Sequence, residues 1–217
     1  MKYKIKKIQI SCDGGAATGK TTAAKMISKK YKLKFLSSGL LYRYASYLLM
    51  RNKSINKLSF LKKKFKDLNY KKLSKVNLHT PKISEHSSII AKDKEIRKVL
   101  KKFQINFSNK YKNCCIEGRD ISTKILPESN VKFFFKCNLQ TAARRRFKEL
   151  KRKKVKIKFK DVKKALRIRN ISDVKRKHSP LLKHRNSIVI DTGKLNKPAM
   201  LAKMTWHVEN FLKKYEK

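Results

Sequence analysis

Acidic residues are scarce in this sequence. Its 217 residues include 60 Lys and Arg but only 14 Asp and Glu, which gives a formal net charge of +46 at pH 7. Long apolar runs are also missing, because no stretch approaches the roughly eighteen apolar residues that a membrane-spanning helix needs. The chain does not open with a charged segment followed by an apolar one, as a secretory signal would. We therefore expect a soluble, cytoplasmic protein that does not enter a membrane.

The four cysteines do not form a recognisable framework. No pair has the C-x-x-C spacing that is typical of zinc or redox sites. Each lies in or beside a predicted strand, where a free cysteine acts as a small apolar side chain. Because hydrophobic residues make up 40% of the chain, we expect one sizeable α/β domain with a packed core.

The positive charge first suggests a nucleic-acid-binding protein. However, the basic residues are spread along the whole chain, and none of the known RNA- or DNA-binding modules is recognisable. Most of them are Lys, accompanied by many Asn and Ile, as expected from the codon bias of an AT-rich genome. We favour this codon bias, together with the binding of anionic nucleotides, as the explanation of the positive charge. We expect no specific nucleic-acid partner. Weak, salt-sensitive, nonspecific binding of RNA is expected at such a charge.

One stretch near the N-terminus carries a phosphate-binding motif. Residues 14–21 read GGAATGKT, which fits the P-loop pattern G-x-x-x-x-G-K-[ST]. A predicted strand over Ile5–Ser11 precedes it and a predicted helix over Thr22–Ser28 follows it, which is the context that the motif needs. Backbone N–H groups would surround a phosphate, Lys20 would bridge the β- and γ-phosphates of ATP, and Thr21 would hold Mg²⁺. The predicted nucleotide-binding residues are Gly14, Gly15, Ala16, Ala17, Thr18, Gly19, Lys20, Thr21 and Thr22.

The remaining chain alternates between predicted strands and helices. Further strands are predicted at Lys34–Gly39, where a turn should end the strand, and at Cys114–Ile116, Val131–Cys137 and Ser187–Asp191. Helices are predicted at Leu40–Met50, near Leu58–Phe65, from about Ile83 with helical spacing continuing to Phe107, and at Leu139–Arg152, Phe159–Ser172 and Lys197–Lys213. Residues 68–80 look irregular. This alternation indicates a P-loop three-layer α/β/α fold with a five-stranded parallel sheet, which binds ligands at the carboxyl ends of its strands.

Four clusters besides the P-loop fall where such a fold binds ligands. They are Ser38 with Arg43, Ser88 with Arg97, residues 117–120, and Arg169 with Asp173 and Arg176. The last three are spaced four and then three residues apart, so we expect them to project from one face of a helix. Each cluster alone could be an exposed ion pair or a turn. Arginines at these places in a lysine-rich chain nevertheless favour phosphate binding, because the guanidinium group binds phosphate oxygens bidentately.

Five motifs, taken in order, resemble those of bacterial cytidylate kinases, a family of the nucleoside monophosphate kinase group. They are GGAATGKTT, SSGLLYR, EGRDIST, RNISDVKRKHSPL and IVIDT. The resemblance runs from about Ile8 to the C-terminal helix. It implies a monomeric enzyme of pyrimidine nucleotide metabolism that transfers the γ-phosphoryl group of ATP to CMP or dCMP with the help of Mg²⁺.

The resemblance also implies a role for each matching residue. The nucleotide acceptor would be bound by Ser38, Arg43, Ser88, Arg97, Arg119, Asp120, Arg169, Asp173 and Arg176. Catalysis would depend on Lys20, Arg119, Asp120, Arg145 and Arg146. Glu117 would hold a water bound to Mg²⁺. The chain departs from the family pattern at Ser37, where an acidic residue is usual, and at Ala142, where the first lid arginine would fall.

The resemblance further implies how the single domain of residues 1–217 is divided. A core would comprise residues 1–51, 84–138 and 176–217, with an acceptor-binding insert at about 52–83 and a lid at about 139–175. The insert is shorter than the small sheet that is usual in the family, which leaves acceptor affinity and base selectivity open. A broader UMP/CMP kinase and an inactive P-loop RNA-binding protein remain the alternatives, although the surviving acceptor arginines disfavour the second.

Overall fold

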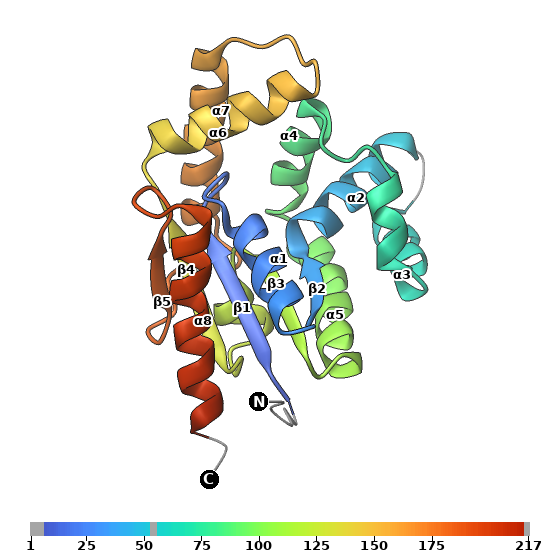
Figure 1. Ribbon diagram of the computed structural model, residues 1–217. Helices are drawn as coiled ribbons and strands as arrows, with labels where there is room; N and C mark the ends of the chain where they lie inside the picture. Colours follow the sequence, from blue (N-terminus) through green and yellow to red (C-terminus); the bar gives the residue numbers. More distant parts are fainter. Residues whose placement is uncertain (1–6, 53–55, 215–217) are drawn as a thin grey trace.

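The computed structural model describes residues 7–52 and 56–214. Its five strands are β1 (Gln9–Gly14), β2 (Lys34–Ser37), β3 (Cys114–Gly118), β4 (Val131–Lys136) and β5 (Ile188–Asp191). They form one sheet in the order β2-β3-β1-β4-β5, and every neighbouring pair is parallel. The P-loop strand β1 therefore lies at the centre of the sheet (Figure 1). The predicted five-stranded parallel sheet is confirmed.

Helices cover both faces of the sheet, which explains why its strands are so apolar. On one face, α1 (Lys20–Lys30) and α8 (Lys197–Lys213) pack against Phe133 and Phe135 of β4. On the other face, α2 (Ser38–Arg51) and α5 (Lys94–Lys110) pack against Leu36 and Ile116. Cys12, Cys114 and Cys115 are buried in these two cores, as expected for cysteines acting as apolar side chains.

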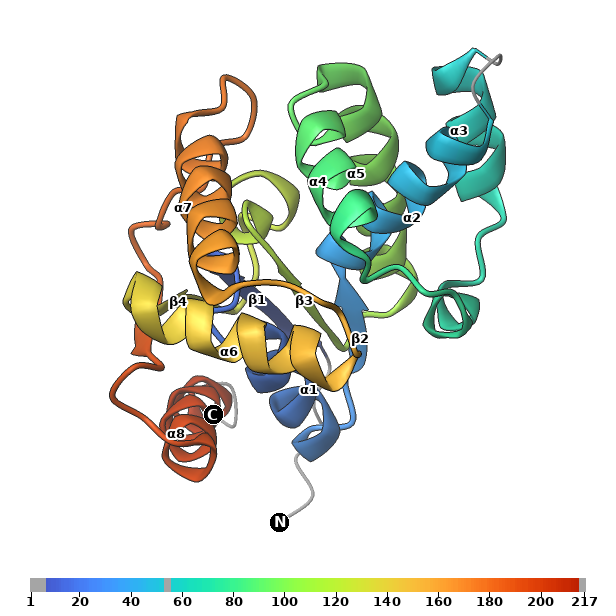
Figure 2. The same cartoon turned by 90° about the horizontal axis from the view of Figure 1, so that it is seen from above.

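Two further groups of helices extend from this three-layer core (Figure 1). The first contains α3 (Lys57–Lys66), the 3₁₀ helix η1 (Tyr70–Lys75) and α4 (Pro81–Ile90). The second is the pair α6 (Leu139–Arg152) and α7 (Phe159–Lys175), which buries its own small core around Leu150, Val162 and Leu166. This second pair lies above the carboxyl end of β1 in Figure 1, and in Figure 2 α7 faces α4 across the top of the molecule.

Several sequence predictions need correction at the element boundaries. The first strand begins at Gln9 and runs through Gly14, whereas part of the predicted range lies outside the described residues. No turn ends β2, because α2 starts directly after Ser37, whose hydroxyl oxygen accepts a hydrogen bond from the backbone N–H of Leu40.

The helical stretch predicted from Ile83 to Phe107 is interrupted. It forms α4 and α5, and Asp93 caps the second helix through backbone N–H groups of its first turn. The irregular stretch of residues 68–80 contains η1. Across residues 7–52 and 56–214, none of the helices combines the length and apolar character needed to cross a membrane.

Candidate active site

Two glycines shape the loop between β1 and α1. Gly14 has φ 151°, and a Cβ atom there would lie 2.4 Å from the carbonyl oxygen of Phe135, so β4 comes too close for a side chain. Gly19 adopts the left-handed conformation with φ 84° as the N-cap of α1. Within the described chain no side chain caps α1. Its N-terminus therefore presents backbone N–H groups and the positive end of the helix dipole to the loop.

Lys20 is the most strongly perturbed cation of the loop. Its side chain is buried, and its Nζ donates to the carbonyl oxygen of Gly15 at 2.9 Å. Burial lowers the pKa of Lys20 to about 7, and the positive charges of Arg119 and Arg169 act in the same direction. An anion placed in the loop would restore the charge of this amine.

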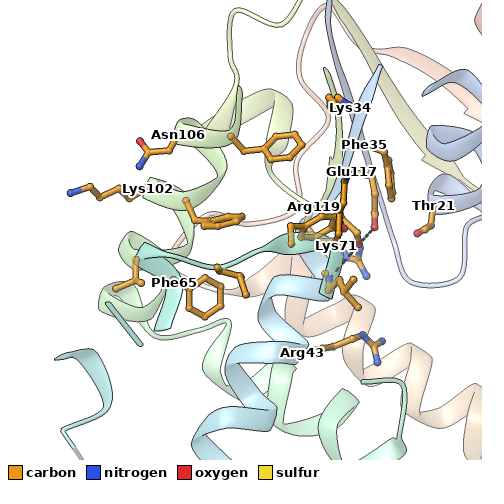
Figure 3. A pocket seen from close by; sticks show the side chains of 18 of the residues that line it. Thr21, Lys34, Phe35, Arg43, Phe65, Lys71, Lys102, Asn106, Glu117 and Arg119 are labelled. Carbon is orange, nitrogen blue, oxygen red and sulfur yellow. Dashed lines mark hydrogen bonds between the residues drawn. The ribbon is translucent and has the colours of Figure 1, made fainter. Parts of the chain in front are cut away.

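A cleft of about 1990 Å³ opens beside the loop, and four arginines from different elements line it. Thr21 and Thr22 line the same cleft, together with Lys20 and, near the arginines, the acids Glu117 and Glu149. Figure 3 shows Thr21, Glu117, Arg119 and Arg43 gathered toward one side of it. The four arginines are Arg43 of α2, Arg119 after β3, Arg146 of α6 and Arg169 of α7.

Two of these four arginines, Arg43 and Arg169, form no ion pair within the described part of the chain, whereas Arg119 and Arg146 each pair with an acid. The Nε of Arg169 is buried without a hydrogen-bond partner among the described residues. Burial, followed by the positive charges of Arg119 and Arg43, lowers the pKa of Arg169 to about 9. Arg43 donates to the carbonyl oxygen of Leu78 and to the hydroxyl of Ser84, and burial lowers its pKa to about 10. Such a cluster of cations fits phosphate groups, which would supply the missing charge and acceptors.

A buried ion-pair network joins five of the predicted acceptor residues. Arg97 pairs with Asp120, and Arg119 Nε lies 2.8 Å from Asp173 Oδ2. Arg176 connects the two pairs, since it lies 3.8 Å from Asp120 and 3.4 Å from Asp173. Chain segments more than fifty residues apart are thereby brought together. Apart from Arg119, these residues are not among those that line the cleft.

The prediction that Arg169, Asp173 and Arg176 share one helical face is wrong for Arg176. Helix α7 ends at Lys175, and Arg176 is the C-cap in an extended conformation with ψ 139°. Its side chain still contacts Asp120 and Asp173 of the network. Its Nε donates a hydrogen bond to the carbonyl oxygen of Ser179 at 2.6 Å.

Two predicted serines make no contact with this network in the described structure. Ser38 is the buried first residue of α2. Ser88 lies in α4, where its hydroxyl donates to the backbone carbonyl of Ser84 at 3.2 Å. Neither is among the described residues that line the cleft.

The two predicted lid arginines have different partners, because successive residues of a helix point about 100° apart. Arg145 donates to the hydroxyl and the carbonyl oxygen of Thr192 at 2.8 and 2.7 Å. Arg146 pairs with Glu149 at 2.8 Å and lines the cleft. Ala142, which replaces the first lid arginine, is buried in the small core of α6 and α7.

Sequence reasoning missed three residues that support the loop. The buried carboxylate of Asp13 accepts the N–H groups of Ile121 and Ser122, and burial raises its pKa to about 6. The hydroxyl of Thr192 donates to the Thr18 carbonyl at 2.7 Å. Both positions could have been suspected, because Asp13 directly precedes the first glycine of the P-loop and Thr192 directly follows β5.

Asn170 is the third missed residue. Its Oδ1 accepts the backbone N–H of Ala16 at 3.1 Å and so connects α7 to the P-loop. No local signal could have identified it, because the contact depends on how α7 lies over the loop that follows β1.

Ser37 and Glu117 form a unit at the carboxyl ends of β2 and β3. The Ser37 hydroxyl donates to the Glu117 carboxylate and also accepts from the N–H of Leu40. The serine that replaces the usual acid therefore caps α2 and orients Glu117. No group of three or more His, Cys, Asp or Glu side chains arranged for a metal occurs among the described residues. A Mg²⁺ ion here would have to be bound largely through nucleotide phosphates and water.

The parallel sheet, the P-loop and the arginine-lined cleft define a P-loop kinase. A solved shikimate kinase from Bacteroides thetaiotaomicron shares this fold with a TM-score of 0.50 and 10% identity, over 95% of this chain and 98% of that chain. The family model of cytidylate kinase matches residues 10–210. The chain therefore belongs to the cytidylate kinase family.

Curated relatives agree with this assignment over most of their length. A cytidylate kinase of Bartonella tribocorum is 34% identical, with 91% of this chain and 93% of the relative covered. A cytidylate kinase of Fusobacterium nucleatum is 36% identical, with 87% of this chain and 91% of the relative covered.

Proposed function

We propose that this protein is a cytidylate kinase that transfers the γ-phosphoryl group of ATP to CMP or dCMP, giving ADP and CDP or dCDP. One observation carries the proposal: Lys20 and arginines from four separate elements converge on one cleft beside the P-loop. Membership of the cytidylate kinase family supports cytosine as the acceptor base. We further propose that the enzyme acts as a cytoplasmic monomer in pyrimidine nucleotide metabolism.

The donor triphosphate is assigned to the P-loop of residues 14–22. Backbone N–H groups at the start of α1 bind phosphate oxygens, and Lys20 neutralises the β- and γ-phosphates. The hydroxyl of Thr21, which is exposed at the cleft, is placed to hold Mg²⁺, and Glu117 can accept a hydrogen bond from a water on the ion. When bound, the ion would neutralise charge on the transferred group.

The acceptor nucleotide is assigned to the opposite wall of the cleft. Arg43, Arg119 and Arg169 bind its phosphate, whose oxygen attacks the γ-phosphorus in line as the bond to the β-phosphate oxygen breaks. Asp173 holds Arg119 in place, and Asp120 extends the buried network to Arg97 and Arg176. Catalysis then comes from positioning and charge neutralisation, without a covalent intermediate.

The helices α6 and α7 are proposed as the lid, and residues 52–83 as the shortened acceptor-binding insert. Closure of the lid would bring Arg146 and Arg169 onto the phosphates and exclude water that would otherwise hydrolyse ATP. Arg145, which contacts Thr192 in this structure, is proposed to act on the donor side.

The experiment is ADP release from ATP measured separately with CMP, dCMP, UMP and AMP. Strong stimulation by CMP and dCMP with little from UMP or AMP is expected. Lys20→Ala should abolish turnover, whereas Lys197→Ala, an exposed lysine of α8, should not change it. Equal use of UMP would replace the proposal by a broader pyrimidine kinase. Failure of every acceptor, with ATP still bound, would contradict kinase activity altogether.

A further inference from the structure

The cleft continues well beyond the phosphate-binding end. Its volume of about 1990 Å³ exceeds the roughly 300–1,000 Å³ of ordinary small-molecule pockets. The additional space is lined by α3, η1 and α5 rather than by the P-loop and the lid. Figure 3 shows Lys102 and Asn106 on the side of the cavity opposite Thr21 and Arg43. We call this extension the α3–α5 groove.

Helix α5 presents two parallel rows of side chains to the groove. Residues four apart lie on the same side of a helix and are separated by about 6 Å along its axis. One row is polar and mostly basic, and the other is apolar and mostly aromatic. The rows are Lys98, Lys102, Asn106 and Lys110, and Val99, Phe103, Phe107 and Tyr111.

The opposite wall of the groove repeats this combination. Lys62, Lys63 and Lys66 of α3 are exposed beside the aromatic rings. The ring centroids of Phe65 and Phe103 lie 5.9 Å apart. The half-buried ring of Phe107 continues the series, with centroids 6.3 Å from Tyr70 and 4.8 Å from Tyr111. Aromatic rings, all half-buried except the buried Phe65, therefore line the groove together with lysines of α3 and α5.

Few acids offset this charge. Asp67 and Glu95 line the groove, and Glu95 pairs with Lys98 at 2.8 Å. Lys66, Lys102 and Lys110 are exposed. The groove thus has an excess of positive charge in addition to that of the phosphate-binding cations.

We propose that the α3–α5 groove binds single-stranded RNA. Lysines at steps of about 6 Å along α5 can follow the successive phosphates of an extended strand. The partly buried rings of Phe103, Phe107 and Tyr111 line the groove, and aromatic rings that stack against bases are the usual arrangement in sites for single strands. A duplex would not present unstacked bases to these rings. This binding does not depend on the identity of the kinase acceptor.

The test compares two triple variants that lose the same charge. Lys98→Gln/Lys102→Gln/Lys110→Gln changes exposed lysines of α5 in the groove. Lys197→Gln/Lys203→Gln/Lys213→Gln changes exposed lysines of α8 on the other face of the sheet. Binding of a labelled RNA of about ten nucleotides is measured by fluorescence anisotropy over a range of KCl concentrations. The logarithm of the RNA association constant falls linearly with the logarithm of the KCl concentration. Loss of three phosphate contacts should make this slope less steep by about 2 and weaken binding about tenfold or more.

The α8 variant should keep both the slope and the affinity within about twofold of the unchanged protein. Both variants should retain CMP-dependent turnover, which shows that they are folded. Equal losses in the two variants would overturn the proposal, since binding would then follow net charge alone. Equally tight binding of duplex RNA, or of inorganic polyphosphate of similar charge, would overturn it as well, because no base would then contribute.

Discussion

The charge of Lys20 depends on its neighbours. Its amine is buried beside Arg119 and Arg169, with the Gly15 carbonyl as its hydrogen-bond acceptor. Arg169 is similarly short of partners, since its Nε is buried without an acceptor in the described part of the chain. Both side chains are therefore less stable as cations in the empty cleft than in water. A bound phosphate reverses this, which links nucleotide binding to proton uptake.

This linkage predicts that ATP binding weakens as the pH rises. Burial lowers the pKa of Lys20 to about 7 in the empty protein, so above pH 7 the amine is mostly neutral and must gain a proton when the phosphates bind. The dissociation constant of ATP should therefore rise by up to about tenfold per pH unit between pH 7 and 9. Isothermal titration calorimetry in buffers of different ionisation enthalpy should show the proton uptake. Lys20→Met should bind more weakly and show no uptake, and a flat pH profile of the unchanged protein would contradict the prediction.

At the scale of elements, α7 connects the two halves of the site. It carries Arg169 toward the cleft, Asp173 toward Arg119, and Asn170 toward the P-loop. The Asn170 oxygen accepts the N–H of Ala16, and it would lie 3.3 Å from a Cβ atom added to Gly15. A single helix therefore positions Arg119, Arg169 and the P-loop relative to one another.

We predict that Asn170→Ala weakens the use of ATP more than the use of CMP. Loss of one hydrogen bond to the loop should raise the KM for ATP about fivefold, because such a bond contributes about 1 kcal/mol. The measurement is steady-state kinetics with each substrate varied in turn. Asn170→Asp retains an acceptor oxygen and should recover most of the loss, while Asn109→Ala on the exposed surface of α5 serves as the control. Equal effects on both substrates would indicate a general structural role instead.

At the scale of the whole molecule, the net charge of +46 opposes folding, because the compact state brings like charges together. The buried pairs of Arg97, Asp120, Asp173 and Arg119 are shielded from salt, whereas most of the lysines are exposed. Added salt should therefore screen repulsion between lysines more than it weakens the attractive pairs.

We predict that the free energy of unfolding rises with ionic strength. Between about 50 and 500 mM KCl the screening length falls from more than 10 Å to a few ångströms, and a gain on the order of 1 kcal/mol is expected. Urea unfolding followed by circular dichroism measures it, with sucrose as an uncharged control. A decrease in stability would mean that ion pairs, rather than repulsion between lysines, dominate the electrostatic energy.

Most of the fold could be predicted from the sequence because its elements are specified by nearby residues. Alternating apolar runs gave the five strands, and α6 and α8 have the predicted boundaries of 139–152 and 197–213. The P-loop could be recognised because its glycines and Lys20 all lie within eight consecutive residues. The predicted start of a helix was wrong where a capping side chain sets it. Ser37 caps the first turn of α2, and Asp93 caps the first turn of α5.

Which residues of the candidate site contact one another was decided by the tertiary structure alone. Motif order indicated which residues belong to the site. It could not reveal that Arg176 leaves α7 and lies between Asp120 and Asp173, or that Asn170 contacts Ala16. The contacts of Arg176 with Asp120 and of Asn170 with Ala16 join residues more than 50 and more than 150 positions apart, and they depend on the strand order and on how α6 and α7 pack. The sequence by itself determined the elements and the chemical groups through local hydrogen bonding and periodicity, whereas long-range packing decided which charges meet.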